Sequence, residues 1–345
     1  MKSSRSTSFR FPDFHSMRLH RRPEISRSES ERPLLLGLGN FDGVHLGHQA
    51  LVKRVIASAR GLKGLPALFT FPEHPQKILK PGFLPSLVTG LDQKLFLLEQ
   101  MGITDVFLIA FTKAFSEISA KDFIRQWLVE KLNVQTVFMG ARARFGYQRM
   151  GDAKFMEAES HRLGFSFEKI EPIRIRGKEV SSSRIREFLK KGKLRAVEEY
   201  LGRSYSVFGS VVKGSGRGRD LGFPTANLDT GDCLLPPEGV YPVRVRALKI
   251  KRKMISEGLE DFSAEPQGAW KEGVLNFGKR PTFEKAKRSV AEVFLLNWQG
   301  DLYGQTLEIV FYPQIREEKA FLNQETLIRQ IEQDIEQARD YFRIA

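Results

Sequence analysis

Two histidines, His45 and His48, lie three positions apart in the segment GNFDGVHLGH, which spans residues 39–48. The apolar run at residues 34–38 predicts a buried strand before this segment, and residues 48–58 predict a helix after it. A helix N-terminus binds phosphate through its free N–H groups, and both imidazoles can donate to phosphoryl oxygens as charge develops in a transfer reaction. Histidines beside a turn are also common structural residues, so the pair alone leaves both interpretations open.

The order of strand, glycine-rich turn, His-x-Gly-His and helix resembles the signature of the HxGH nucleotidyltransferases. These enzymes transfer a nucleotidyl group from a nucleoside triphosphate and release pyrophosphate. The resemblance implies that His45 and His48 are catalytic, because they can stabilise transition-state charge without a covalent intermediate. The residues of this segment expected to bind the nucleotide are Gly39, Asn40, Phe41, Asp42, Gly43 and Gly47.

A serine cluster at residues 181–183 leads into a predicted short helix at residues 187–190. Such a cluster is commonly a helix N-cap, but Arg186 falls on the same side of the first turn and can hold a triphosphate. The run SSSRIR resembles the (S/T)SSTxIR motif of the adenylyltransferase module of bacterial FAD synthetases, with serine in place of the usual threonine. The resemblance implies a catalytic Arg186 and nucleotide binding by Ser181, Ser182 and Ser183. The segment TFPEHP at residues 70–75 resembles that module's TFxPHP loop with two residues exchanged.

A second glycine-rich run, GSGRGR at residues 214–219, precedes LGFPTAN at residues 221–227. Successive N–H groups in such a loop can cradle phosphates, although no Gly-Lys-Ser/Thr closes it as in a Walker A loop. Thr225 and Asn227 lie on alternate positions of an extended segment, and their oxygens suit Mg²⁺ as ligands. The run GRGRDLGFPTAN resembles a motif specific to riboflavin kinases. The residues expected to bind nucleotide here are Gly214, Gly216, Arg217, Gly218, Gly222, Pro224, Thr225 and Asn227.

Further parts of the riboflavin kinase pattern follow in order along the chain. They are GVY at 239–241, NFGKRPT at 276–282, Glu292, LYG at 302–304, and Arg316 with Phe321. An isolated glutamate on a strand usually lies on a solvated face, but the resemblance implies that Glu292 accepts the proton of the flavin's ribityl hydroxyl. Phe223, Arg316 and Phe321 are expected to bind the flavin. Asn297 stands where the family usually has Asp.

The loop GARARFG at residues 140–146 departs from the family pattern. Related FAD synthetases usually carry Gly-x-Asp/Asn-Phe-x-Phe-Gly here, so Arg142 replaces a short polar residue and Ala143 replaces an aromatic one. The lost aromatic removes stacking area for a flavin or adenine, and the guanidinium favours phosphate or repels a neighbouring cation. We expect Arg142 and Ala143 to border the flavin and to weaken or alter the use of FMN.

Apolar runs alternate with amphipathic stretches between residues 34 and 170, which predicts a parallel sheet with helices on its faces. After Lys193 the runs are rich in Val, Tyr and Phe without long helices between them, which predicts an antiparallel barrel or sandwich. The resemblance implies an α/β chain, with an N-terminal Rossmann-like HxGH nucleotidyltransferase domain and then an antiparallel six-stranded riboflavin-kinase β-barrel with a C-terminal helix. Strands are expected at residues 65–71, 106–111, 134–139, 165–170, 205–212, 240–248, 290–296 and 307–312, and helices at 92–101, 121–131 and 152–163.

The predicted organisation has three segments and one insertion. Residues 1–33 are rich in Ser and Arg and lack periodicity, which predicts a basic, flexible tail, with an organelle transit peptide as the less favoured alternative. The FMN adenylyltransferase domain is placed at residues 34–202 and the riboflavin kinase domain at 203–345. The basic stretch at 249–270 is expected to be an exposed insertion.

The composition narrows the class of protein. The chain has 345 residues, of which 41% are hydrophobic and 28% charged, and the single Cys233 excludes an internal disulfide framework. A reducing, cytoplasmic compartment is therefore expected, and no membrane association, because no run of about 18 apolar residues exists. The net charge of +14 raises the question of nucleic acid. Much of it lies in the phosphate-binding segments, without interleaved aromatics or zinc-finger spacing, so nucleic acid is not expected as a partner.

Together the motifs resemble the bifunctional riboflavin kinase/FMN adenylyltransferase family. The resemblance implies phosphorylation of riboflavin to FMN and adenylylation of FMN to FAD with release of pyrophosphate, using ATP as co-substrate and Mg²⁺. Expected partners are riboflavin, FMN, FAD and ATP, with transient delivery of flavin to apo-flavoproteins. Two alternatives stay open: a riboflavin kinase with an impaired adenylyltransferase domain, and a basic nucleic-acid-binding or regulatory protein on the same scaffold.

Overall fold

The computed structural model describes residues 16–23, 32–80, 82, 86–214, 222–279 and 289–344. Backbone contacts divide the chain into two compact units. Unit 1 comprises Met1–Pro85, Lys94–Val180 and Lys251–Ser263, and unit 2 comprises Ser86–Gln93, Ser181–Ile250 and Ala264–Ala345. The first unit is built around parallel strands and the second around antiparallel strands.

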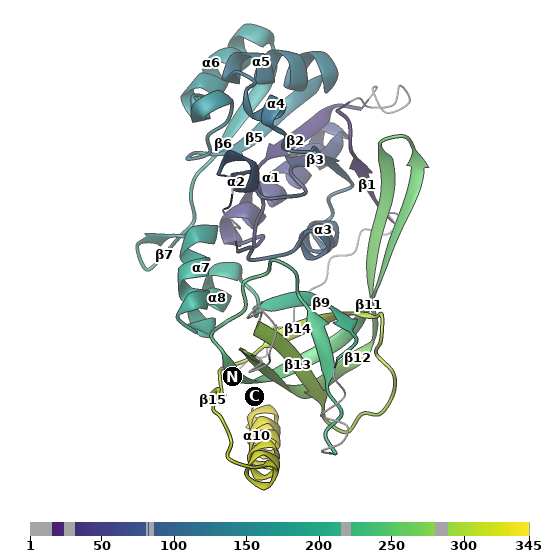
Figure 1. Ribbon diagram of the computed structural model, residues 1–345. Helices are drawn as coiled ribbons and strands as arrows, with labels where there is room; N and C mark the ends of the chain where they lie inside the picture. Colours follow the sequence, from purple (N-terminus) through teal and green to yellow (C-terminus); the bar gives the residue numbers. More distant parts are fainter. Residues whose placement is uncertain are drawn as a thin grey trace. The chain divides into compact units, whose positions relative to one another are not determined.

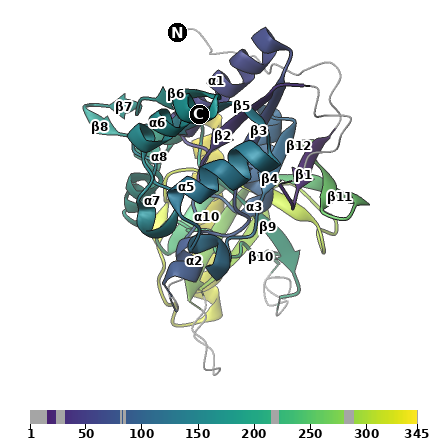
Figure 2. The ribbon, with the colours of Figure 1, turned by 90° about the horizontal axis from the view of Figure 1, so that it is seen from above.

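Unit 1 contains a parallel sheet with the strand order β1, β4, β3, β2, β5, β6 (Figure 1, with β4 labelled in Figure 2). Its strands are β1 (Met17–His20), β2 (Leu34–Leu38), β3 (Leu65–Thr70), β4 (Asp105–Leu108), β5 (Val134–Gly140) and β6 (Ser166–Ile170). After β2 the chain adds β3 and β4 on one side and then β5 and β6 on the other. This reversal makes the carboxyl ends of β2 and β5 a topological switch point, where open α/β sheets bind their ligands.

Helices cover both faces of the parallel sheet (Figure 2), and β2 in its middle is therefore buried at every position. Leu34 and Leu36 belong to a core cluster with residues of the π-helix Phe123–Lys131. On the other face lies α1 (Leu46–Leu62), and Gly37 leaves room for it, since a Cβ there would lie 2.7 Å from Leu51. The other helices are α2 (Gln76–Leu79), α3 (Leu91–Gln100), which begins in unit 2, α4 (Lys113–Ser116), α5 (Ala120–Asp122), the 3₁₀ turn Tyr147–Arg149 and α6 (Ala153–Leu163).

Unit 2 contains a closed ring of antiparallel strands. In the described part of the chain six strands form it, in the order β11, β14, β9, β10, β13, β12, with β12 pairing back to β11. The strands are β9 (Ser206–Val212), β10 (Ala226–Asp229), β11 (Gly239–Ser256), β12 (Leu259–Lys279), β13 (Ser289–Leu295) and β14 (Thr306–Phe311), and β15 (Arg316–Glu317) pairs with β11. The helices α7 (Ser182–Lys190), α8 (Leu194–Leu201) and α10 (Gln324–Ile344) also belong to the described part of this unit. The predicted fold class is confirmed.

Two expectations about exposed segments are wrong. The tail predicted through residue 33 contains β1, which pairs in parallel with β4 and antiparallel with β12; its other residues up to 15 and at 24–31 lie outside the described residues. The insertion predicted at 249–270 forms the long arms of the β11–β12 hairpin, and Phe262 in it is fully buried against β1. Both were missed because β1 has only four residues and the hairpin arm carries many basic side chains that point to solvent.

The predicted domain boundary near Gly202 differs from the division by backbone contacts. Helices α7 and α8 group with unit 2, where Phe188 packs on Tyr200 at 5.2 Å between ring centroids. The tip of the β11–β12 hairpin groups with unit 1. Independent folding of residues 34–202 and 203–345 stays a prediction.

A buried carboxylate ties β1 to the edge of the sheet. Asp105, which is fully buried in β4, is hydrogen-bonded to His20 at 2.8 Å and receives hydrogen bonds from Arg18 at 3.0 Å and the Thr104 hydroxyl at 2.7 Å. Burial alone would raise the pKa of Asp105, but the bond to His20, the charge of Arg18 and the Thr104 hydroxyl outweigh it and lower the pKa. The ionised carboxylate therefore stabilises the folded unit.

We expect Asp105→Asn to lower the free energy of unfolding of unit 1 by about 3 kcal/mol at pH 7, because buried donors lose their charged partner. Since the folded pKa lies below the unfolded value of about 4, this stabilisation is complete above that pH and is lost as the pH falls through the folded pKa. Urea unfolding, followed by hydrogen exchange of β1 and β4, measures the effect. Glu157→Gln, on the exposed side of α6, is the matched control. An equal loss at pH 7 and pH 3 would contradict the electrostatic explanation.

Candidate active sites

Three loops begin side by side at the carboxyl edge of the parallel sheet. Leu38, the last residue of β2, is the register partner of Phe69 in β3 and of Met139 in β5. The segments GNFDG, TFPEHP and GARARFG that follow these strands therefore start at the switch point. The topology brings together the loops that the sequence motifs singled out in unit 1.

The turn after β2 runs through left-handed backbone conformations at three residues. Phe41 has φ of 52°, Gly43 has 85° and Val44 has 39°. Such values are uncommon outside glycine and cost free energy unless the surroundings enforce them. Both apolar side chains are buried, and the Val44 N–H donates to the Phe41 carbonyl at 3.1 Å. Gly39 leaves room for the Phe41 ring, which a Cβ would approach to 3.1 Å.

The two histidines of the motif lie together at the start of α1. His45 is the N-cap, and its Nδ1 accepts from the His48 backbone N–H at 3.3 Å, which leaves the ring proton of a neutral imidazole on Nε2. The two rings stack with centroids 3.6 Å apart and 14° between their planes. Gly47 is needed for this arrangement, since a Cβ there would lie 3.2 Å from the His45 ring. His45 therefore caps the helix and lies at its N-terminus, the end at which helices can bind phosphate.

A buried lysine that the sequence reasoning missed reaches the same turn. Lys94 on α3 is only 5% exposed, and its ammonium donates to the carbonyl of Phe71 at 2.8 Å and to that of Asn40 at 3.4 Å. Burial lowers the pKa of Lys94 to about 8, and the negative charge of Asp42 acts in the opposite direction. The spacing of Lys94 from the buried Leu98, four positions on, was the available signal, because it places the lysine on the core face of the helix.

The atypical loop after β5 is tied to a small hairpin formed by β7 (Arg174–Ile175) and β8 (Lys178–Glu179). The guanidinium of Arg142 pairs with Glu179 at 2.5 Å, and Arg174 pairs with the same carboxylate at 3.1 Å. Ala143 packs partly buried against the core cluster of the sheet. The extra guanidinium therefore has a carboxylate partner within unit 1.

The serine cluster has the geometry of an N-cap. Ser181 caps α7, with its hydroxyl accepting from the Arg184 N–H at 3.4 Å, and Ser182 and Ser183 form the first turn. Arg186 Nε donates to the Ser86 carbonyl at 2.8 Å within unit 2. The structural interpretation of this cluster is thus realised, and its predicted contact with a nucleotide stays a prediction.

In unit 2 the polar residues of three neighbouring strands form a row. Asn227 in β10 and Asn276 in β12 are both register partners of Glu292 in β13, so all three point to the same side of the sheet. The Thr225 hydroxyl lies 3.5 Å from a carboxylate oxygen of Glu292. Gly214 packs against Asn227, because a Cβ there would lie 2.0 Å from its amide nitrogen. Thr225 and Asn227, predicted together from one motif, are therefore neighbours of Glu292, which was predicted from a later segment.

The residues expected to bind flavin pack beside α10. Phe223 contacts Phe294 edge to face, with centroids 5.8 Å apart. Arg316 binds Asp334 of α10 through two guanidinium nitrogens, at 2.9 and 2.7 Å, and lies 5.7 Å from the Phe321 ring. Arg316 is thus held by a carboxylate that is only 3% exposed, a partner that no motif indicated.

For some described residues of the predicted nucleotide-binding loop in unit 2, the structure shows no contact that bears on binding. Gly222, with φ of 86°, and Pro224 are exposed. The predicted phosphate-binding residues Gly216, Arg217 and Gly218 lie outside the described residues.

Among the described side chains no group of three or more His, Cys, Asp or Glu could hold a metal ion, and no described helix is both long and apolar enough to cross a bilayer.

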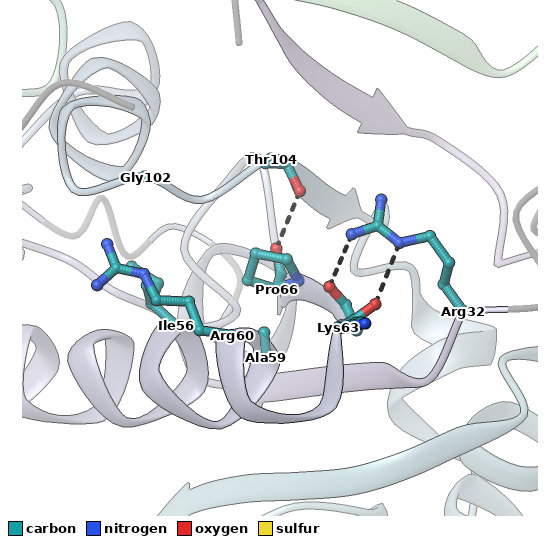
Figure 3. Close-up of a pocket in the computed structure, with 9 residues that line it drawn as sticks. Arg32, Ile56, Ala59, Arg60, Lys63, Pro66, Gly102 and Thr104 are labelled. Carbon is teal, nitrogen blue, oxygen red and sulfur yellow. Dashed lines mark hydrogen bonds between the residues drawn. The ribbon is translucent and has the colours of Figure 1, made fainter. Parts of the chain in front are cut away.

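A cavity of about 150 Å³ lies in unit 1 beside the residues that precede β3 and β4. Figure 3 shows the side chains that line it. Arg32 donates to the carbonyls of Lys63 and Gly64, which line the cavity with it. None of the predicted site residues lines it. Its lining residues are Arg32, Ile56, Ala59, Arg60, Lys63, Gly64, Pro66, Gly102 and Thr104.

A doubly wound sheet with an HxGH turn, followed by a six-stranded ring with a polar row, defines a nucleotidyltransferase-like module joined to a kinase-like barrel. The chain matches the family model of FAD synthetases over residues 27–184 and that of riboflavin kinases over residues 201–342. It belongs to the bifunctional riboflavin kinase/FMN adenylyltransferase family. The predicted family and its two transferase activities are confirmed at the level of these modules.

Relatives cover most of the chain. The bifunctional riboflavin kinase/FMN adenylyltransferase of Haemophilus influenzae is 34% identical, over 89% of this chain and 94% of its own. That of Bacillus subtilis is 33% identical, over 91% of this chain and 94% of its own. A solved structure from Streptococcus pneumoniae, titled a macrolide-efflux protein, is 25% identical with a TM-score of 0.74, over 89% of this chain and 94% of its own.

We expect the double variant Arg142→Asn plus Ala143→Phe to raise kcat/KM for FMN adenylylation by about tenfold, the equivalent of one aromatic contact of about 1.4 kcal/mol. The single variant Arg142→Asn is the control, because it removes the pair with Glu179 without adding a ring. Riboflavin kinase activity of the same chain reports on general damage. Unchanged or lower efficiency in a folded double variant would show that these two residues do not limit the reaction.

Proposed function

We propose that unit 2 phosphorylates riboflavin to FMN and that unit 1 adenylylates FMN to FAD, with ATP as co-substrate in both reactions. The observation that carries this proposal is that the His45–His48 motif lies at the carboxyl edge of the parallel sheet of unit 1, whereas Thr225, Asn227 and Glu292 lie together in unit 2. Incubation of the purified chain with riboflavin, ATP and Mg²⁺, with separation of FMN from FAD, tests it.

For the kinase reaction we assign the base to Glu292. Its carboxylate lies between two asparagines in the polar row and beside the Thr225 hydroxyl, so it can accept a proton from an acceptor hydroxyl within hydrogen-bond reach. The oxygens of Thr225 and Asn227 fit Mg²⁺, which takes few protein ligands alongside substrate phosphates. Bound there, Mg²⁺ would neutralise phosphate charge. Phe223, Arg316 and Phe321 are the proposed flavin contacts.

For the adenylyl transfer we assign charge stabilisation to His45 and His48 at the N-terminus of α1. The stacked rings lie at the helix N-terminus, where they present donors to a bound triphosphate. The glycines and Asn40 of the preceding turn allow the close approach of backbone to phosphate. Arg186 and the serine cluster are proposed nucleotide contacts on the strength of their motif.

A second candidate function is a riboflavin kinase with weakened FAD synthesis. The observation that favours it is the replacement of the usual polar and aromatic loop residues by Arg142 and Ala143, with Arg142 paired to Glu179. We place the chain in the cytoplasm, as its single cysteine suggests, and we propose that it hands its flavin products to apo-flavoproteins.

We expect Glu292→Gln to lower riboflavin kinase turnover by about 10² to 10⁴, because a positioned base is lost. FMN adenylylation, measured with FMN supplied directly, should stay near the wild-type rate. Glu265→Gln, at an exposed position of β12, is the matched control. Equal losses of both activities would indicate that Glu292 supports folding instead.

We expect His45→Ala and His48→Ala each to reduce FAD formation by about 10² or more, because donors to the developing charge are removed. Production of FMN from riboflavin should be spared. His161→Ala, exposed near the end of α6, controls for loss of an imidazole. Full FAD synthesis in both site variants would refute the assignment.

A further inference from the structure

The ammonium of Lys94 joins the ends of two neighbouring strands. It donates to the carbonyl of Asn40, two residues after β2, and to the carbonyl of Phe71, directly after β3. It also lies 3.4 Å from the hydroxyl of Thr70, which itself donates to the Asn40 carbonyl at 3.2 Å. Two donors therefore converge on one carbonyl in the turn that leads to His45.

That turn needs external support. Phe41 and Val44 hold left-handed φ angles that non-glycine residues adopt at a cost of about 1–3 kcal/mol each. The charge-assisted hydrogen bonds of an ammonium are about twice as strong as neutral ones. The ammonium of Lys94, which donates to the Asn40 carbonyl, is thus well suited to hold the turn in its left-handed conformation.

A structural alternative for Lys94 is a simple core contact, which an apolar side chain would make at lower cost. Burying an ammonium is expensive unless it is hydrogen-bonded and has a charge partner. Lys94 has both, with Asp42 in the same turn as the carboxylate that acts on it. The cost is therefore offset only in the arrangement that also fixes the turn.

We propose that Lys94 is a positioning residue for adenylyl transfer, whose charged side chain fixes residues 40–44 and so orients His45 and His48 toward the triphosphate. This inference depends on the proposed role of the two histidines. It assigns Lys94 no contact with substrate. The positive charge, and not only the volume of the side chain, is the property that matters.

The proposal predicts a pH dependence specific to one of the two activities. The groups that face the ammonium are the Asp42 carboxylate, the Thr70 hydroxyl and the carbonyls of Asn40 and Phe71. Because burial lowers the pKa of Lys94 to about 8, the side chain loses its charge as the pH rises through that value. For FMN adenylylation, kcat/KM should fall above about pH 8, since this parameter reports groups of the free enzyme.

The test compares Lys94→Met, Lys94→Gln and Lys94→Arg in the full chain, with FMN and ATP as substrates. We expect Lys94→Met to lower kcat by roughly 10²-fold, as a small misplacement of catalytic groups can, with KM for ATP changed much less. Lys94→Gln, which keeps a donor without charge, should be nearly as slow. Lys94→Arg should recover activity and lose the decline near pH 8, because a guanidinium stays charged to beyond pH 12. Lys53→Gln, exposed on α1, is the matched control.

Several outcomes decide the proposal. It is overturned if wild-type kcat/KM shows no decline between pH 7 and pH 9.5, a result that requires no variant to fold. It is also overturned if Lys94→Met keeps full activity, or if Lys94→Arg is active and retains the decline near pH 8. If His45→Ala is inactive while Lys94→Met is normal, only the role of Lys94 fails. If His45→Ala is fully active, the proposed site itself fails.

Discussion

The constraint on which unit 1 depends is the short path from β2 to α1. A strand buried on both faces ends at Leu38, and the helix starts at Leu46, so the turn between them must reverse direction beside two neighbouring strands. Right-handed backbone alone does not make this path, and three residues take positive φ. The surroundings answer this requirement, with Gly39 and Gly47 leaving space for rings and Lys94 supplying charge. The residues that pack the core around this turn therefore also set the positions of His45 and His48.

In unit 2 the corresponding constraint is strand register. Asn227, Glu292 and Asn276 form one row because three strands pair residue against residue. A slip of one residue in β13 would turn Glu292 into the barrel and bring Ala291 or Val293 to the polar side. Closure of the ring opposes such a slip, because β10 and β12, which flank β13, are themselves paired with the strands on their other sides. The polar row therefore depends on the register of the strand pairs as much as on the identity of its three residues.

Much of the architecture was predictable because its signals are local. Alternating apolar and amphipathic stretches predicted the parallel sheet. The HxGH turn follows β2, which lies at the switch point of that sheet. Three features were not predictable in this way. The strand β1 is too short for a periodic pattern, and the β11–β12 arm hides its pairing behind basic side chains. The partner of Arg316, Asp334, is chosen by the approach of α10 to the barrel, which no local pattern specifies.

The pairing of β1 has a consequence for the newly made chain. Leu19 pairs with Val106 of β4 on one side and with Glu260, near the tip of the long hairpin, on the other. Translation delivers β1 to β6 well before that hairpin emerges, so the nascent first unit carries an open sheet edge in the meantime. Unpaired edges are templates for association with other chains. The β1 edge therefore stays without its β12 partner until the ribosome has passed that hairpin, and a chain that ended before it would keep this edge without β12.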